Sequence, residues 1–132
     1  MTAVGLIGGG VAVDAISAAI SDTDAETVSI DTDAVGRVDI AVVIETVGSA
    51  VFERATEQAR ETETPLVCLE LGGIGGHPLV EVDAAISGYA PGTACYDCLY
   101  DRIAASDPET DDGAYATPTS RLAGAVAGRE LA

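Results

Sequence analysis

In the first half of this chain, short apolar runs alternate with longer segments whose apolar residues recur at helical spacing. The short runs are predicted strands: Val4–Ile7, Val28–Ile30, Val38–Ile44 and Leu66–Leu71. The third run is continuous in apolar and β-branched residues, which is typical of a central parallel strand buried on both faces. The pattern therefore predicts a sheet with at least one fully covered central strand.

The longer segments predict two helices between these strands. The first is Val11–Ile20, and the second begins after Ser49, a helix-capping residue, and runs to about Arg60 before Pro65. Because strands and helices alternate, the chain is predicted to be an α/β protein. The expected architecture is a Rossmann-like three-layer sandwich with a mainly parallel central sheet.

After a glycine-rich loop, the hydrophobic pattern of the second half differs from that of the first. Val80–Ile86 is predicted to be extended in one or two pieces, Cys95–Ala105 to be helical, and Asp107–Gly113 to be an acidic loop. A last helix is expected to begin at Thr117, which precedes a proline, and it is still running at Ala132. We expect residues 1–132 to be one domain, the N-terminal part of a longer protein.

The charge balance is strongly acidic, with 22 acidic residues against 6 basic ones, a formal net charge of −16 and no lysine. Such a field repels nucleic-acid backbones, so we expect no nucleic-acid partner. The carboxylates are scattered, which favours adaptation to high salt in a halophile over recognition of a cationic partner. No basic leader and no run of ~20 apolar residues is present, so a cytoplasmic protein without a membrane span is expected.

A glycine turn after the first predicted strand is a candidate nucleotide site. Gly8, Gly9 and Gly10 would let a phosphate approach free N–H groups at the following helix. Asp31 or Asp33 lies at about the spacing of the acid that bonds a ribose hydroxyl. The alternative is that the glycines only make a tight turn and the aspartates only end a strand.

Two cysteines three residues apart, Cys95 and Cys98, have the spacing of half a zinc site. A tetrahedral site needs two more ligands, and no second pair is present. Cys68 lies in a predicted buried strand, and His77, the only histidine, is predicted to be a loop residue and not a base. Within these residues, burial of the cysteine pair as small apolar side chains is favoured over zinc.

Five segments in order carry a resemblance to a known family. After the glycine turn they are Ser29–Val35, Asp39–Ile44, Thr64–Val67, Gly92–Arg102 and Ala116–Gly128. This order resembles the ThiF-type, ubiquitin-activating-like adenylating enzymes and covers nearly the whole chain. The resemblance implies a Rossmann-like fold that binds ATP, and cysteines in the fourth segment that hold half of a structural zinc site.

Several departures from that family concern its chemistry. The lysine that contacts the nucleotide phosphates is missing, and the Thr-Asp-Asn that follows the third strand reads Glu45, Thr46, Val47 here. Gly36 and Arg37 lead to the next strand where the family has an Asn-Arg-Gln segment and a helical insertion. Adenylation needs cations or metal to offset phosphate charge, so loss of adenylation is expected.

The chain in this respect resembles the catalytically depleted ThiF-like domains of YcaO-type cyclodehydratases. That resemblance implies a non-catalytic docking domain, which presents a precursor peptide to a YcaO-type partner or downstream domain. Two alternatives stay open: a nucleotide-binding Rossmann module for ATP or a dinucleotide, and a dimerisation domain that forms a homodimer through a sheet edge or the last helix.

Overall fold

The computed structural model describes residues 2–21, 23–92 and 96–106. The predicted acidic loop and the predicted helix from Thr117 lie outside these ranges, as does Cys95. Among the described residues, no helix has both the length and the apolar content that crossing a membrane requires.

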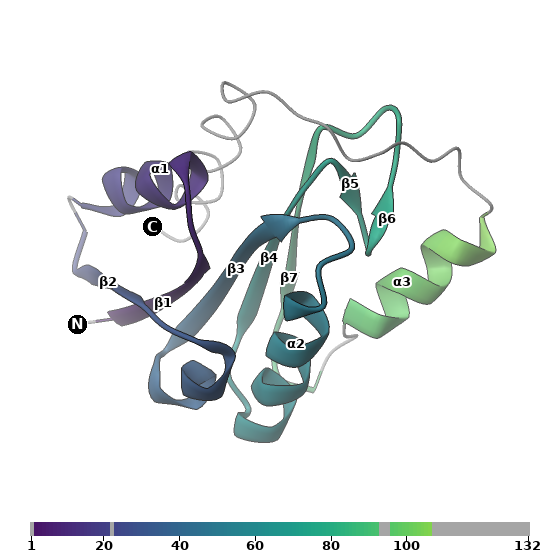
Figure 1. Cartoon of the computed structure of the whole chain (residues 1–132). Coiled ribbons are helices and arrows are strands. Elements are labelled where there is room, and N and C mark those ends of the chain that lie inside the picture. The colour runs from purple at the N-terminus through teal and green to yellow at the C-terminus, as the bar shows by residue number, and fades with distance from the viewer. Residues whose placement is uncertain (1, 22, 93–95, 107–132) are drawn as a thin grey trace.

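The core of the fold is a five-stranded sheet with the strand order β2-β1-β3-β4-β7 (Figure 1). The first four strands in this order are parallel, and β7 is antiparallel to β4. The mainly parallel sheet predicted from the sequence is therefore confirmed. The strands are β1 (Thr2–Gly8), β2 (Ala25–Ser29), β3 (Ile40–Thr46), β4 (Leu66–Leu71) and β7 (Ala84–Tyr89).

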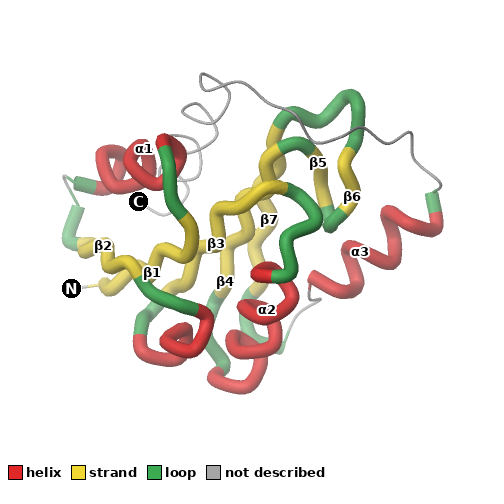
Figure 2. Tube along the Cα trace, viewed as in Figure 1, coloured by secondary structure: helices red, strands yellow, loops and turns green. Residues whose placement is uncertain are grey.

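Helices cover both faces of this sheet, which gives the predicted three layers (Figure 2). One face carries α1 (Val11–Ile20), and the other carries the 3-10 helix η1 (Thr32–Arg37), α2 (Val51–Thr62) and α3 (Tyr96–Ala105). A small hairpin of β5 (Gly73–Ile74) and β6 (His77–Pro78) stands beside α3.

Successive residues of β3 show how one strand supplies two cores. Val42 and Ile44 pack in the cluster that contains α1, whereas Ala41 and Val43 pack in the cluster that contains α2. All four are buried, because side chains alternate between the faces of a strand and both faces are covered here. This explains why the run in the sequence is continuously apolar.

Several predicted strand boundaries were wrong, and the first strand, for example, is Thr2–Gly8 and not Val4–Ile7. The second strand begins at Ala25 and not at Val28, because Glu26 and Thr27 pair with β1 through backbone groups at the sheet edge. The third begins at Ile40, since Val38 still donates its N–H to the last turn of η1. In the predicted extended segment 80–86, only residues from Ala84 onward form a strand.

Ser49 does not cap α2 as predicted, because the N-cap position is Ala50, which makes no side-chain cap hydrogen bond, and Ser49 lies one residue earlier. Its Oγ accepts a hydrogen bond from the N–H of Val51 at 3.3 Å, and its carbonyl oxygen accepts one from the N–H of Phe52, also at 3.3 Å. The helix itself begins at Val51 and ends at Thr62, where Glu63 follows in the left-handed conformation at φ 55°.

Candidate functional site

The carboxyl ends of the parallel strands bring most of the predicted site residues to one edge of the sheet. The turn Gly8–Gly10 begins at the last residue of β1, and Asp31 follows β2, its immediate parallel neighbour. The two ends are joined by a 3.0 Å hydrogen bond from the N–H of Ile30 to the carbonyl of Leu6. The chain crosses from β2 to the far side of β1 before β3, so the order reverses at β1, where ligands of open α/β sheets bind.

The three glycines of the turn have different structural roles. Gly8 has φ +126°, and a Cβ on it would lie 2.1 Å from the backbone oxygen of Ile44, so the close approach of β1 and β3 requires glycine. Gly9 and Gly10 are exposed and have open space where a Cβ would be. Gly10, at φ +89°, precedes α1 without a side-chain cap. Gly8 thus has a structural role, whereas Gly9 and Gly10 leave room for a ligand.

The charge at this edge is unfavourable to phosphate. The short segments that directly follow β1, β3 and β4 contain neither lysine nor arginine. Asp31 and Asp33 are exposed, and Asp14 adds an exposed carboxylate in the first turn of α1. In the described part of the chain, no group of three or more His, Cys, Asp or Glu side chains is arranged to hold a metal ion.

A buried glutamate beside this edge connects three parts of the fold. The sequence analysis did not single it out. Glu70, on β4, is fully buried and accepts hydrogen bonds from the N–H of Gly75 at 2.8 Å, the N–H of Gly76 at 2.7 Å and the hydroxyl of Tyr96 at 2.8 Å. One carboxylate therefore joins the central sheet, the β5–β6 turn and α3. A single acid within an apolar strand, followed by a glycine loop, was the signal for it.

Tyr96 holds the amino end of α3 against the sheet. Burial and the neighbouring Glu70 raise its pKa, so the phenol stays protonated and can donate to the carboxylate. Its ring stacks on Phe52 with a centroid distance of 5.5 Å and meets Tyr89 edge-on at 6.5 Å. These contacts fix where α3 lies relative to α2.

His77, predicted to be a loop residue, lies in the short strand β6. Its Nε2 is 3.0 Å from the carbonyl oxygen of Tyr100, and the centroids of the two rings are 4.3 Å apart. The imidazole therefore connects the hairpin to α3, which is a structural contact and does not require a base.

A cavity of about 210 Å³ lies between the carboxyl edge and α3. We call it the α2–α3 cavity. One wall is the connection from β3 into α2 and the first turn of that helix, with Glu53 as its charged residue, and the other consists of Gly76 and two tyrosines of α3. The described lining is Gly48, Ser49, Ala50, Glu53, Gly76, Tyr96 and Tyr100.

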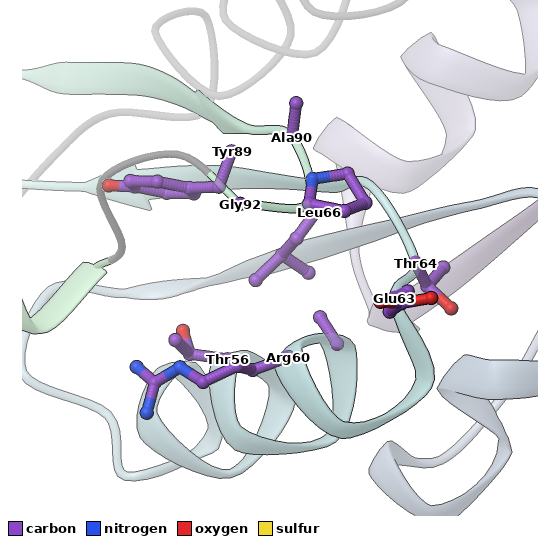
Figure 3. A pocket seen from close by; sticks show the side chains of 10 residues that line it. Thr56, Arg60, Glu63, Thr64, Leu66, Tyr89, Ala90 and Gly92 are labelled. Atoms are coloured by element: carbon purple, nitrogen blue, oxygen red, sulfur yellow. The ribbon is translucent and has the colours of Figure 1, made fainter.

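A second cavity of about 130 Å³ lies at the opposite edge of the sheet (Figure 3). It is bounded by the last turns of α2, the start of β4 and the end of β7, and Figure 3 shows Leu66 pointing from β4 toward α2. Arg60 and Glu63 place opposite charges in its lining. Arg60 also forms a 3.5 Å ion pair with Asp97 of α3, with both side chains well exposed, so it contributes little to stability.

The cysteines do not share one environment. Cys68 is fully buried in β4, as predicted, and burial and the charge of Glu70 raise the pKa of its thiol. Cys98 is exposed, which corrects its interpretation as a buried core residue, whereas Cys95 lies outside the described residues. The physical reason is helical geometry: α3 turns Tyr96 inward, and a residue two positions further lies on the opposite side of the helix.

This difference predicts selective labelling of the thiols. In the metal-free protein, a maleimide should modify Cys98 at least ~100-fold faster than Cys68, because the thiolate is the nucleophile and Cys68 is both inaccessible and hard to ionise. Peptide mapping by mass spectrometry would assign each rate. Equal rates for Cys68 and Cys98 under native conditions would contradict the positions of β4 and α3.

The fold and the carboxyl-edge geometry define a Rossmann-like α/β domain. No family model and no curated protein matches the chain, but solved structures match it over 98% of its length. One is a heterocyclase in complex with substrate and cofactor, with a TM-score of 0.63, 16% identity and 18% of that chain covered. Another is E. coli MccB with selenomethionine MccA, with a TM-score of 0.63, 13% identity and 54% of that chain covered.

E. coli MccB with succinimide is also similar, with a TM-score of 0.61, 12% identity and 54% of that chain covered. The present chain thus spans about half of MccB and less than a fifth of the heterocyclase chain. At 16% identity or less, this likeness shows a shared fold, and the Rossmann-like α/β fold expected from the sequence is confirmed.

Proposed function

We propose that this chain is a ThiF-like docking domain, which binds a precursor peptide and presents it to a YcaO-type cyclodehydratase partner or downstream domain. The observation that carries the proposal is the match over 98% of the chain to a heterocyclase solved with its substrate and to MccB solved with MccA. In the proposed role the domain supplies a binding surface and leaves the ATP-dependent step to the YcaO-type partner.

The composition of the carboxyl edge supports a role without adenylation. Phosphoryl and adenylyl chemistry concentrates negative charge that cations or metal ions must offset. The strand ends here carry carboxylates, with Glu45 in the register position beside Glu70, and the segments after β1, β3 and β4 have no basic side chain. The negative charge of these carboxylates would repel the phosphates of a nucleotide bound at this edge.

We propose that a zinc ion bound by this domain would have a structural role. Cys95 and Cys98 have the spacing of two thiolate ligands, and the exposed position of Cys98 on α3 fits a site completed by two ligands from other residues or another chain. Such an ion would stabilise α3 at the edge of the domain and would not take part in the reaction.

The second candidate function is nucleotide binding at the same edge. It is favoured by the adjacency of the Gly8–Gly10 turn and Asp31 at the ends of neighbouring strands, and by the open space at Gly9 and Gly10. Asp33, in the first turn of η1, would complete the ribose contact. Titration of AMP, ATP and NAD would show saturable millimolar or tighter binding if this candidate is correct.

The docking proposal predicts peptide binding without nucleotide activation. Selection of a displayed random peptide library on the immobilised protein, in molar potassium chloride to suit an acidic protein, should enrich peptides. An enriched peptide should bind in solution with a Kd of roughly 1–100 μM by fluorescence anisotropy. ATP–pyrophosphate exchange should stay at background. Exchange above background, or enrichment no greater than on bare resin, would overturn the proposal.

A further inference from the structure

We propose that the α2–α3 cavity binds a cationic side chain, the guanidinium or ammonium group of an arginine or lysine in a docked peptide. The inference rests on the proposed docking function and specifies which chemistry of the peptide the domain recognises. The cavity measures about 210 Å³, well above the space one water needs, which suits the end of one side chain and not a longer peptide segment.

The aromatic wall of the cavity is held in place by the Glu70 network. Tyr96 and Tyr100 both approach Gly76: a Cβ on that glycine would lie 3.1 Å from the hydroxyl of Tyr96 and 2.6 Å from the Tyr100 ring. Gly76 is itself fixed by its hydrogen bond to Glu70 and has φ +83°. The two rings are therefore positioned before any ligand arrives, which reduces the entropy lost on binding.

The charge of the lining selects a cation. Glu53 is acidic, and none of the described lining residues is basic. The His77 ring packs against Tyr100, but Tyr100 remains 42% exposed, and the negative face of an aromatic ring attracts a cation. The formal charge of −16 over the whole chain adds an attraction toward cations at low and moderate salt.

An anion is the alternative ligand, because the cavity adjoins the amino end of α2. Two of the donors there are already engaged, since Ser49 accepts hydrogen bonds from the N–H groups of Val51 and Phe52. The hydroxyl of Tyr96 is likewise directed to Glu70 and not to the cavity. With these donors occupied and the Glu53 carboxylate nearby, an anion would lose its water without gaining equivalent partners.

The place of the cavity in the fold agrees with a recognition role. It opens where β3 ends and α2 begins, and Gly76 brings in the loop that follows β4. This is the edge of a parallel sheet at which ligands of such folds bind. A peptide held there by one basic side chain would pass along the carboxyl edge of the sheet.

Two small probes that differ in charge test the proposal. N-acetyl-arginine amide and its uncharged analogue N-acetyl-citrulline amide would be titrated into the whole chain in molar potassium chloride, with amide NMR shifts as readout. The arginine probe should shift the signals of Gly48 and Gly76 saturably, and the citrulline probe should bind about 10-fold more weakly. Equal affinity of the two probes would overturn the proposal.

Single substitutions test whether the arginine probe binds in the α2–α3 cavity. Glu53→Gln should raise the Kd of the arginine probe roughly 3- to 10-fold, and Tyr100→Leu should have a similar effect. Glu57→Gln is the matched control, because Glu57 is an exposed acid one turn further along α2 and outside the described lining. If Glu57→Gln weakened binding of the arginine probe as much as Glu53→Gln does, the effect would come from the overall charge. That result would contradict binding of the probe in the α2–α3 cavity.

The displayed-peptide selection separates this inference from the docking proposal. Enriched peptides that carry arginine or lysine and lose affinity in Glu53→Gln support both. Enriched peptides that bind Glu53→Gln unchanged overturn the cation site and leave docking intact. If no peptide is enriched but the arginine probe still binds at Gly48 and Gly76, docking fails and the cation site stands.

Discussion

Replacing Glu70 with glutamine is expected to lower the free energy of unfolding by about 3 kcal/mol. The glutamate oxygens accept from the N–H groups of Gly75 and Gly76 and from the hydroxyl of Tyr96. Glutamine keeps the shape but turns one acceptor into an NH₂ donor, so in either orientation a buried donor faces another donor. Chemical denaturation at constant salt would measure the loss.

Hydrogen exchange supplies a local readout for the same variant. The amides of Gly75 and Gly76 should exchange faster in Glu70→Gln than in the parent protein, because their acceptor is weakened. Glu57→Gln, at an exposed position of α2, should change stability by less than about 0.5 kcal/mol. A loss below about 1 kcal/mol in Glu70→Gln would show that the carboxylate does not hold the hairpin and α3 together.

Gly8→Ala is expected to destabilise the protein by about 3 kcal/mol. The new Cβ would lie 2.1 Å from the backbone oxygen of Ile44, on the paired central strand, and an alanine would also have to adopt φ +126°. Neither strain can be relieved by rotation of a side chain, so β1 and β3 must separate locally. Thermal and denaturant unfolding would both report the change.

Gly9→Ala is the matched control for Gly8→Ala. A Cβ at position 9 meets nothing within 4 Å, so stability should change by less than about 0.5 kcal/mol. Because Gly9 is also the open part of the turn, this variant tests nucleotide binding without unfolding the strand. Similar destabilisation by the two variants would contradict the close approach of β1 to Ile44.

The hydrophobic pattern was sufficient to predict most of the elements. A strand buried on both faces is apolar at nearly every position, with Glu70 as the exception in β4, so the runs that became β3 and β4 were recognisable without tertiary information. The edge strand β2 was predicted less well, because Glu26 and Thr27 pair through backbone groups that any residue has. The pairs of residues that form β5 and β6 are too short to have a periodicity.

The candidate site also has one part that the sequence predicted and one part that it did not. The spacing of Gly8–Gly10 and Asp31 was enough to predict that they lie together, since a parallel sheet places the carboxyl ends of its strands at one edge. The Glu70 network could not be derived in this way, because its partners lie 5, 6 and 26 residues away and meet only through the β5–β6 turn and α3.

The sequence by itself determined the α/β class, the parallel core and the acidic surface, because these depend on residue type and on periodicity along the chain. The tertiary structure alone decided that Cys98 faces outward, that Tyr96 and Tyr100 converge on Gly76, and that a cavity forms beside Glu53. Those features depend on how α3 is rotated and where it packs. That position is set by contacts of Tyr96 with Glu70 and Phe52, which are distant in sequence.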